Sequence, residues 1–199
     1  MRTRIATDLH DDIGSNLSKI SLLSGIIKLR LANENTQNKQ MLSSISEISR
    51  ESVDSMNDIV WTISPNRDSV LEMTRRMREF AEGLMVERAV RVSFNGPSDG
   101  QHLKLPMNTR RELLLIFKEA VNNAAKYSDC TKIDIEFRVD GFEFFLKIVD
   151  DGRGFDISRN SDGNGLSNMK NRAEKIGGTF SVLTGPGQGT RITINAPSH

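Results

Sequence analysis

The sequence predicts an α+β protein in two parts, a helical hairpin over residues 1–65 and a mixed α/β domain over residues 66–199. In the first part apolar residues recur every three or four positions, which is the spacing of a helix face. Beyond residue 106 this spacing alternates with runs in which every second residue is apolar, as a domain of helices and strands requires. The chain, at 199 residues, is long enough for two small cores.

The first part contains two apolar helix stripes. One runs from Ile5 to Leu31 and the other from Leu42 to Val60, with a polar stretch between them and Pro65 at the end. Two helices with one apolar seam cannot enclose a core, so we expect the hairpin to pair with a second copy of itself as a four-helix bundle. The sequence therefore predicts a homodimer.

In the second part we expect a hinge at residues 64–68, then a helix over 70–87 and a strand over 90–94. Its methionine-rich helix stripe is expected to be core. A long helix is predicted over residues 108–127, and a shorter one lies within the glycine-flanked stretch 163–178. The remaining strands, separated by glycine-containing turns, are expected over residues 133–137, 142–149, 180–183 and 191–195.

Composition excludes several classes of protein. Lys and Arg number 27 against 26 Asp and Glu, so nothing draws the chain as a whole to nucleic acid, and we expect no direct nucleic-acid partner. Cys130 is the only cysteine, which fits a reducing compartment such as the cytoplasm. No apolar run approaches the about 18 residues of a membrane span. Because the amphipathic pattern begins almost at residue 1, we expect a longer protein whose N-terminal region anchors it in the membrane.

His10 stands in an acidic run beside the first apolar stripe. A neutral imidazole is a nucleophile near neutral pH, and Asp11 can hold its Nδ1 proton so that Nε2 is free to attack phosphorus. A solvated acidic helix face that carries an incidental histidine is the alternative.

Glu119, Asn123 and Lys126 share one face of the predicted long helix, because they are spaced by four and three residues. Carboxylate and amide oxygens suit Mg²⁺, and a lysine suits phosphate oxygens. Tyr127 follows directly. A solvated helix edge explains the same pattern without a ligand.

Asp150 stands at the end of a predicted strand and is followed by Gly152 and Gly154. A carboxylate there can accept a proton of the exocyclic amine of adenine, and the glycines let the backbone approach the ring. Gly-X-Gly after a strand is also common in turns without a ligand.

Gly163 and Gly165 open the last predicted helix, with Leu166 next. Glycines there expose backbone amides at the positive end of a helix, which is a usual phosphate site, although a flexible loop is the alternative. A further glycine pair precedes Thr190.

In this order the four clusters resemble the sequence boxes of the two-component sensor histidine kinases, over nearly the whole chain. The helix around His10 is similar to the phosphoacceptor box of the subfamily in which Asp directly follows His, and which acts on response regulators with helix-turn-helix output domains. Residues 119–127 resemble the N box, residues 150–155 the first glycine box and residues 163–169 the second.

The resemblance implies a dimerisation and histidine-phosphotransfer hairpin followed by a Bergerat-type (GHKL) α/β sandwich that binds ATP and Mg²⁺. It implies autophosphorylation of His10, oriented by Asp11, and then transfer to an Asp in the receiver domain of a response regulator. Asn123 and Glu119 would hold Mg²⁺, and Glu119 would either polarise metal-bound water or assist transfer. The implied nucleotide-binding residues are Asn123, Lys126, Tyr127, Asp150, Gly152, Gly154, Gly163, Gly165, Leu166 and Thr190.

Two rivals stay open at this point, an ATPase of the same superfamily that uses ATP as a conformational clamp and a nucleotide-binding scaffold without kinase activity. Ser15 stands where related kinases with phosphatase activity usually carry Gln, so the resemblance does not extend to that activity.

Overall fold

The computed structural model describes residues 15–30, 36–63, 69–97, 104–140, 143–157 and 164–197. Contacts divide the chain into two compact units, Met1–Asn66 and Arg67–His199. Each unit is described by itself. Among the described helices, none is both long and apolar enough to cross a membrane.

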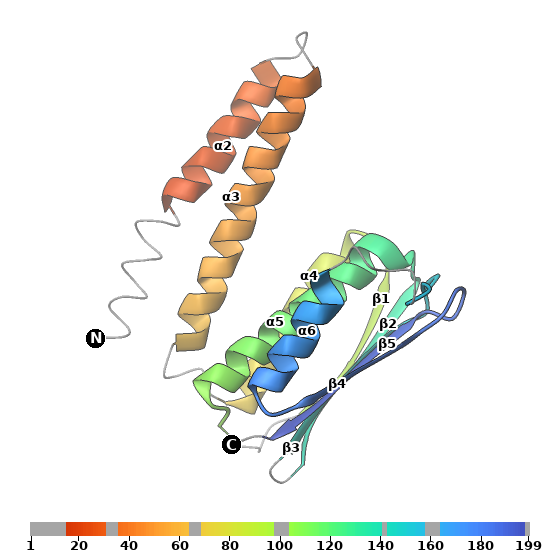
Figure 1. Cartoon of the computed structure of the whole chain (residues 1–199). Coiled ribbons are helices and arrows are strands. Elements are labelled where there is room, and N and C mark those ends of the chain that lie inside the picture. The colour runs from red at the N-terminus through yellow and green to blue at the C-terminus, as the bar shows by residue number, and fades with distance from the viewer. Residues whose placement is uncertain are drawn as a thin grey trace. The chain divides into compact units, whose positions relative to one another are not determined.

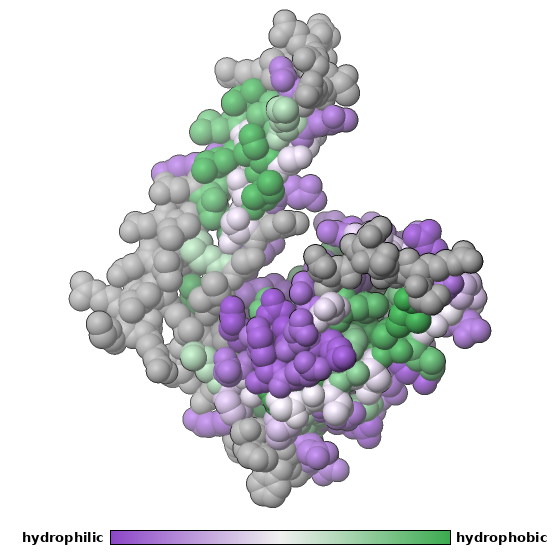
Figure 2. Space-filling view, viewed as in Figure 1, coloured by the Kyte–Doolittle hydropathy of each residue, from purple (hydrophilic) through white to green (hydrophobic). Residues whose placement is uncertain are grey.

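The first unit contains two helices, α2 (Ser15–Arg30) and α3 (Thr36–Ile63), which lie side by side as the predicted hairpin (Figure 1). Serines line part of the seam between them: Ser21, Ser24 and Ser49 are buried, and the hydroxyls of Ser21 and Ser46 lie 3.1 Å apart. Met56 and Trp61 of α3 are buried as well. The large aliphatic residues stay exposed on the hairpin, as Figure 2 shows. They are Ile20, Leu22, Leu23, Ile26, Ile27, Met41, Ile45 and Ile48.

The second unit is a two-layer sandwich in which three helices cover one face of a five-stranded sheet (Figure 1). The strand order is β1-β2-β3-β5-β4, with β1 parallel to β2 and the other neighbours antiparallel. The helices are α4 (Val70–Val86), α5 (Met107–Asn123) and α6 (Asn164–Lys175). The strands are β1 (Arg91–Asn95), β2 (Lys132–Asp140), β3 (Glu143–Asp150), β4 (Thr179–Thr184) and β5 (Thr190–Pro197).

The core of the sandwich lies between the helices and the sheet. Alternate residues of the central strands point toward the helices because successive strand side chains face opposite sides. Phe117 on α5 is fully buried and packs edge-on against Phe80 and Phe94. The methionine stripe of α4 is core, as predicted: Met73, Met77 and Met85 are all fully buried.

One predicted helix changes its winding. The prediction over residues 108–127 holds as an α-helix only to Asn123, and Ala124–Ser128 form a π-turn, η3. The turn ends at Asp129, which has a left-handed backbone conformation (φ 53°). Because a π-turn winds more slowly than an α-helix, residues three apart across this junction no longer share one face. This shift matters for Lys126.

Candidate functional site

A cavity of about 530 Å³ opens between the helices and one end of the sheet in the second unit. It is walled by the end of α5 and its π-turn, the ends of β3 and β5, the loop after β3 and the start of α6. Of the residues predicted for the site, Glu119, Asn123, Tyr127, Asp150, Gly154, Gly165, Leu166 and Thr190 line it. Segments as distant in sequence as α5 and β5 therefore line the same cavity.

Five predicted site residues are not among the lining. Lys126 lies on the π-turn and is exposed, because the slower winding turns it away from the face of Glu119 and Asn123. Gly152 lies behind the wall, packed against Ser128. His10, Asp11 and Gly163 lie outside the described residues.

Glu119 and Asn123 bring oxygen atoms to one side of the cavity. They are one helical turn apart, and Nδ2 of Asn123 donates a hydrogen bond to Oε1 of Glu119 over 3.3 Å. Gly165, in the first turn of α6, comes so close that a Cβ there would collide with the Glu119 carboxylate. The first amides of α6 therefore lie beside these oxygens, which is an arrangement that suits phosphate together with a divalent cation.

Asp150, at the end of β3, brings a carboxylate to the sheet side of the cavity. It is buried, and one wall beside it is formed by Ile148 and Ile192. Oδ1 of Asp150 accepts a hydrogen bond of 3.0 Å from the amide of Gly152. Burial raises the pKa of Asp150, while hydrogen bonds from the Gly152 amide and from Thr190 oppose that rise. A buried acceptor between flat apolar walls suits the amine of a heteroaromatic ring.

The glycine-rich loops of the site lock against one another. Gly154 has a positive φ of 57°, and a Cβ there would collide with the carbonyl oxygen of Gly185 in the β4–β5 turn. The hydroxyl of Thr184 accepts a hydrogen bond of 3.2 Å from the amide of Phe155 and donates one of 2.9 Å to the carbonyl of Gly189. The glycines thus allow the two loops to pack closely on each other, and the approach of their backbone to the adenine ring stays a prediction.

Sequence reasoning missed part of the cavity wall. The additional lining residues are Ala120, Ala124, Ser128, Ile148, Arg153, Phe155 and Ile192. Ile148 and Ile192 were accessible to prediction, since each occupies a helix-facing position in its strand. Ser128 was not, because its burial depends on the π-turn.

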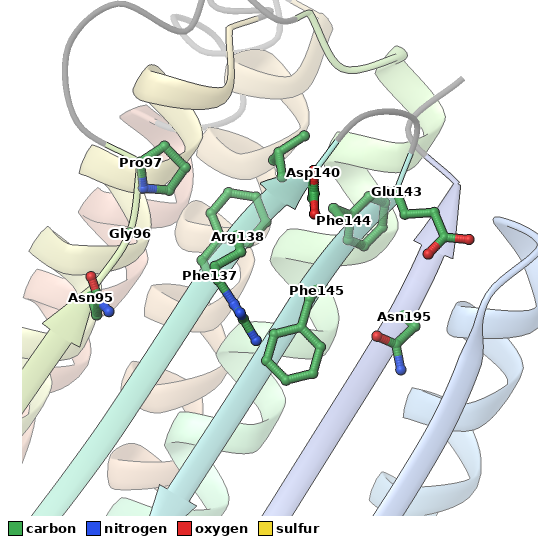
Figure 3. A pocket seen from close by; sticks show the side chains of 11 residues that line it. Asn95, Gly96, Pro97, Phe137, Arg138, Asp140, Glu143, Phe144, Phe145 and Asn195 are labelled. Carbon is green, nitrogen blue, oxygen red and sulfur yellow. The ribbon is translucent and has the colours of Figure 1, made fainter.

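A larger cavity, of about 690 Å³, lies elsewhere in the unit and contains none of the predicted site residues. Figure 3 shows Arg138, Phe145 and Asn195 next to one another on adjacent strands. The Arg138 guanidinium stacks 4.7 Å from the centre of the Phe145 ring. Carboxylates and side-chain amides also line this larger cavity, but none of its lining residues belongs to the start of a helix.

Two family models match the chain. One is described as "Histidine kinase" and matches residues 2–68, and the other, "Histidine kinase-, DNA gyrase B-, and HSP90-like ATPase", matches residues 108–199. The chain belongs to the sensor histidine kinases. The predicted fold class, a helical region followed by a GHKL-type α/β sandwich, is confirmed for this histidine kinase.

Curated relatives of this histidine kinase include the "Sensor protein VraS" of two staphylococci. The protein of Staphylococcus haemolyticus (strain JCSC1435) is 27% identical over 197 residues, which are 98% of this chain and 55% of that protein. The protein of Staphylococcus saprophyticus (strain ATCC 15305) is 28% identical over 201 residues, with the same coverage. The chain thus spans about half the length of the curated relatives it matches.

Solved structures share the fold of this histidine kinase. The histidine kinase domain of the Erythrobacter litoralis EL346 blue-light activated kinase has a TM-score of 0.59 at 15% identity, covering 92% of this chain and 94% of that chain. Full-length ShkA, solved in complex with AMPPNP, has a TM-score of 0.58 at 15% identity, covering 98% of this chain and 45% of that one. At such identities the likeness shows the fold alone.

Proposed function

We propose that this chain is the catalytic core of a two-component sensor kinase, which binds Mg-ATP and transfers the γ-phosphoryl group to His10. The observation that carries the proposal is the cavity of the second unit, which Asp150, Glu119 and Asn123 line together with apolar side chains such as Ile148 and Ile192. Such a cavity offers a place for a base at one side and for phosphates and a metal at the other.

The adenine ring lies between the apolar walls, with its exocyclic amine donating to Asp150. Ile148 and Ile192 contact one side of the base, which removes apolar surface from water. Thr190 and Gly152 hold the carboxylate in place through hydrogen bonds. The raised pKa of Asp150 is compatible with this role, since an ionised acceptor gains a partner for its charge when the amine binds.

The start of α6 would hold the phosphates, and the end of α5 would hold Mg²⁺. No three His, Cys, Asp or Glu side chains gather as a metal site within the described part of the chain, so the ion needs phosphate oxygens as ligands. Glu119 and Asn123 supply the protein oxygens. The amides of Gly165 and Leu166 face the phosphates, and Tyr127 at the cavity wall closes the site. A contact of Lys126 with phosphate stays a prediction, as do the roles of Gly163 at the phosphates and of Gly154 beside the adenine ring.

In the transfer step, Nε2 of His10 attacks the γ-phosphorus as the bond to the β-phosphate oxygen breaks, which leaves ADP and a phosphohistidine. Asp11 holds the Nδ1 proton and so fixes the tautomer. Positioning and charge neutralisation supply most of the rate, because phosphoryl transfer needs little covalent help. The phosphoryl group then passes to an aspartate of a receiver domain in a response regulator.

The hairpin supports a homodimer. Many of its aliphatic residues are exposed in the single chain, whereas Ser21, Ser24 and Ser49 are buried on it. A second copy covers the aliphatic face and forms the four-helix bundle.

The protein acts in the cytoplasm, and its anchoring in the membrane belongs to a region N-terminal to this sequence.

The test is incubation with γ-labelled ATP and Mg²⁺. Label that is labile in acid, stable in alkali and absent from His10→Gln is expected. His102→Gln, a second histidine of the chain, is the matched control and should label as the wild type does. Label that persists in His10→Gln would exclude His10 as the acceptor, and ATP hydrolysis without any label would favour a clamp-type ATPase.

A further inference from the structure

Two neighbouring aspartates at the end of β3 point in opposite directions. Asp150 lines the nucleotide cavity and is buried, whereas Asp151 is exposed and lines a separate surface depression with Thr131 and Lys132. This opposition follows from the strand, where successive side chains lie on opposite faces of the sheet. A role for Asp151 in contact with nucleotide is therefore excluded by its direction.

Asp151 forms an unusually dense set of hydrogen bonds for an exposed carboxylate. Its Oδ1 accepts from the amides of Thr131 and Lys132 over 2.8 Å and 2.9 Å, and its Oδ2 accepts from the Thr131 hydroxyl over 2.7 Å. These bonds, led by that of the Thr131 hydroxyl, lower the pKa of Asp151, so the group is ionised and the bonds are charge-assisted at neutral pH.

We call these hydrogen bonds of Asp151 to Thr131 and Lys132 the clamp. It lies where the backbone hydrogen bonds between β2 and β3 stop. Pairing between β2 and β3 ends with Ile133 opposite Asp150, so the amide of Thr131 has no strand carbonyl opposite it. The Asp151 carboxylate supplies the acceptor in its place, and the amide of Asp151 donates in return to the carbonyl of Lys132 over 3.3 Å. The Thr131 carbonyl also accepts from the amide of Arg91, which joins β1 to the same point.

The segment after β3 and the segment before β2 are joined again at the residues that follow Asp151 in the sequence. The amide of Arg153 donates to the carbonyl of Ser128 over 2.7 Å, and Gly152 packs so closely on Ser128 that any side chain would collide with it. Asp150 is thus flanked by the strand ladder before it and by these contacts after it. We infer that Asp151 is a positioning residue, which fixes the direction of the Asp150 carboxylate toward the base by anchoring the chain at Thr131.

This inference rests on the proposed function, since it concerns the contact of Asp150 with the adenine amine. It is tested with the full chain by calorimetric titration of ADP and of the same diphosphate lacking the 6-amino group. In Asp151→Ala we expect the affinity for ADP to fall about tenfold, the loss of one charge-assisted contact. The affinity for the analogue should change little, so the preference for the amine falls.

Asp134→Ala is the matched control. Asp134 is a half-exposed carboxylate on β2, ion-paired with Lys132 over 2.7 Å, so its removal changes charge equally near the same strands but leaves the clamp intact. Its preference for ADP over the analogue should equal that of the wild type. Asp151→Asn keeps one acceptor oxygen for the amides and should show an intermediate preference. If Asp151→Ala unfolds, as judged by circular dichroism, the measurement on Asp151→Asn decides.

The double variant Asp150→Asn/Asp151→Ala separates this inference from the proposed function. If Asp151 acts through Asp150, adding Asp151→Ala to Asp150→Asn should cost no further ADP affinity. An additive loss, or an unchanged preference in Asp151→Ala and Asp151→Asn, overturns the inference. Undiminished ADP binding in Asp150→Asn alone is a different result, which would overturn the adenine role of Asp150 itself.

Discussion

The hairpin and the sandwich use their apolar residues in opposite ways. Between α2 and α3 the buried side chains include Ser21, Ser24 and Ser49, and large aliphatic residues such as Leu23 and Ile45 are exposed. Between the sheet and its helices, the buried side chains are phenylalanine, methionine, leucine and isoleucine. The sandwich thus encloses its own core within one chain, whereas the hairpin offers most of its aliphatic surface to a partner.

This difference in the placement of apolar residues indicates where each unit obtains its stability. Apolar burial is the dominant favourable contribution to folding, at about 25 cal/mol for each Å² removed from water. The sandwich gains it within the chain, so its folding is independent of protein concentration. In the proposed homodimer the hairpin gains it largely on association, so its folding should depend on concentration.

The largest effect is expected in the core of the sandwich. Phe117→Ala leaves a cavity among Phe80, Phe94 and the sheet, and should lower the free energy of unfolding by about 3–5 kcal/mol. Urea unfolding followed by circular dichroism measures it. Phe145→Ala, on the half-buried Phe145 of β3, is the control and should cost clearly less. Equal losses would contradict the assignment of the core.

Charge on the aliphatic face of the hairpin should break the dimer. Leu23 is 56% exposed in the single chain, so Leu23→Asp costs little there, but it would bury a carboxylate in the bundle. We expect the dissociation constant to rise about 30-fold or more, as for an interface hot spot. Analytical ultracentrifugation measures it. Leu183→Asp, on a leucine of β4 that is 67% exposed, should leave the dimer intact.

Acid should weaken nucleotide binding at the sandwich through Asp150. Burial raises its folded pKa above 3.8, and the ionised form is the one that accepts the adenine amine. ADP affinity should therefore be full above the raised pKa and fall as pH drops through it, by up to about tenfold for each further unit. Calorimetry across acidic pH measures this fall in ADP affinity. Asp150→Asn should bind ADP weakly and show no such fall in affinity at low pH. The same pH dependence in that variant would assign the titration to another group.

The smallest effect is expected in the serine seam. Ser21→Ala leaves the Ser46 hydroxyl without its side-chain partner 3.1 Å away, and should cost about 0.5–1.5 kcal/mol. Because Ser21→Ala/Ser46→Ala removes both hydroxyls, the double variant should lose less than the sum of the two single losses. Thermal unfolding of the three variants at one protein concentration tests this, and strict additivity would show that the hydroxyls do not interact.

Periodicity predicted most of the fold because it reports directly on burial. The alternation at Ile133, Ile135 and Phe137 marks a strand with one buried face, and the structure has β2 there. The two-layer sandwich and the hairpin followed in the same way. What the stripes of the hairpin did not reveal is which residues fill its internal seam, because an aliphatic stripe can face either a neighbouring helix or a second chain.

The cavity residues that were predicted share a local signal, whereas the burial of Ser128, the direction of Lys126 and the partners of Asp151 do not follow from local spacing. Glu119 and Asn123 are one turn apart in a regular helix, so their common face follows from spacing. Lys126 lies on the π-turn, and the change of winding there does not follow from residue spacing. The partners of Asp151 are about 20 residues away in the sequence, and strand pairing alone brings them together.

α4 and β1 carry a practical consequence for dissecting the protein. Residues 69–107 lie outside both family matches, yet Met73, Met77 and Met85 on α4 are fully buried and β1 supplies the parallel neighbour of β2. A fragment cut to the ATPase match at 108–199 would lack α4 and β1 and would expose the apolar surface that they cover. It would also leave the backbone of β2 as an open sheet edge, which invites aggregation. A soluble ATP-binding fragment should instead begin near Arg67, where the second unit begins.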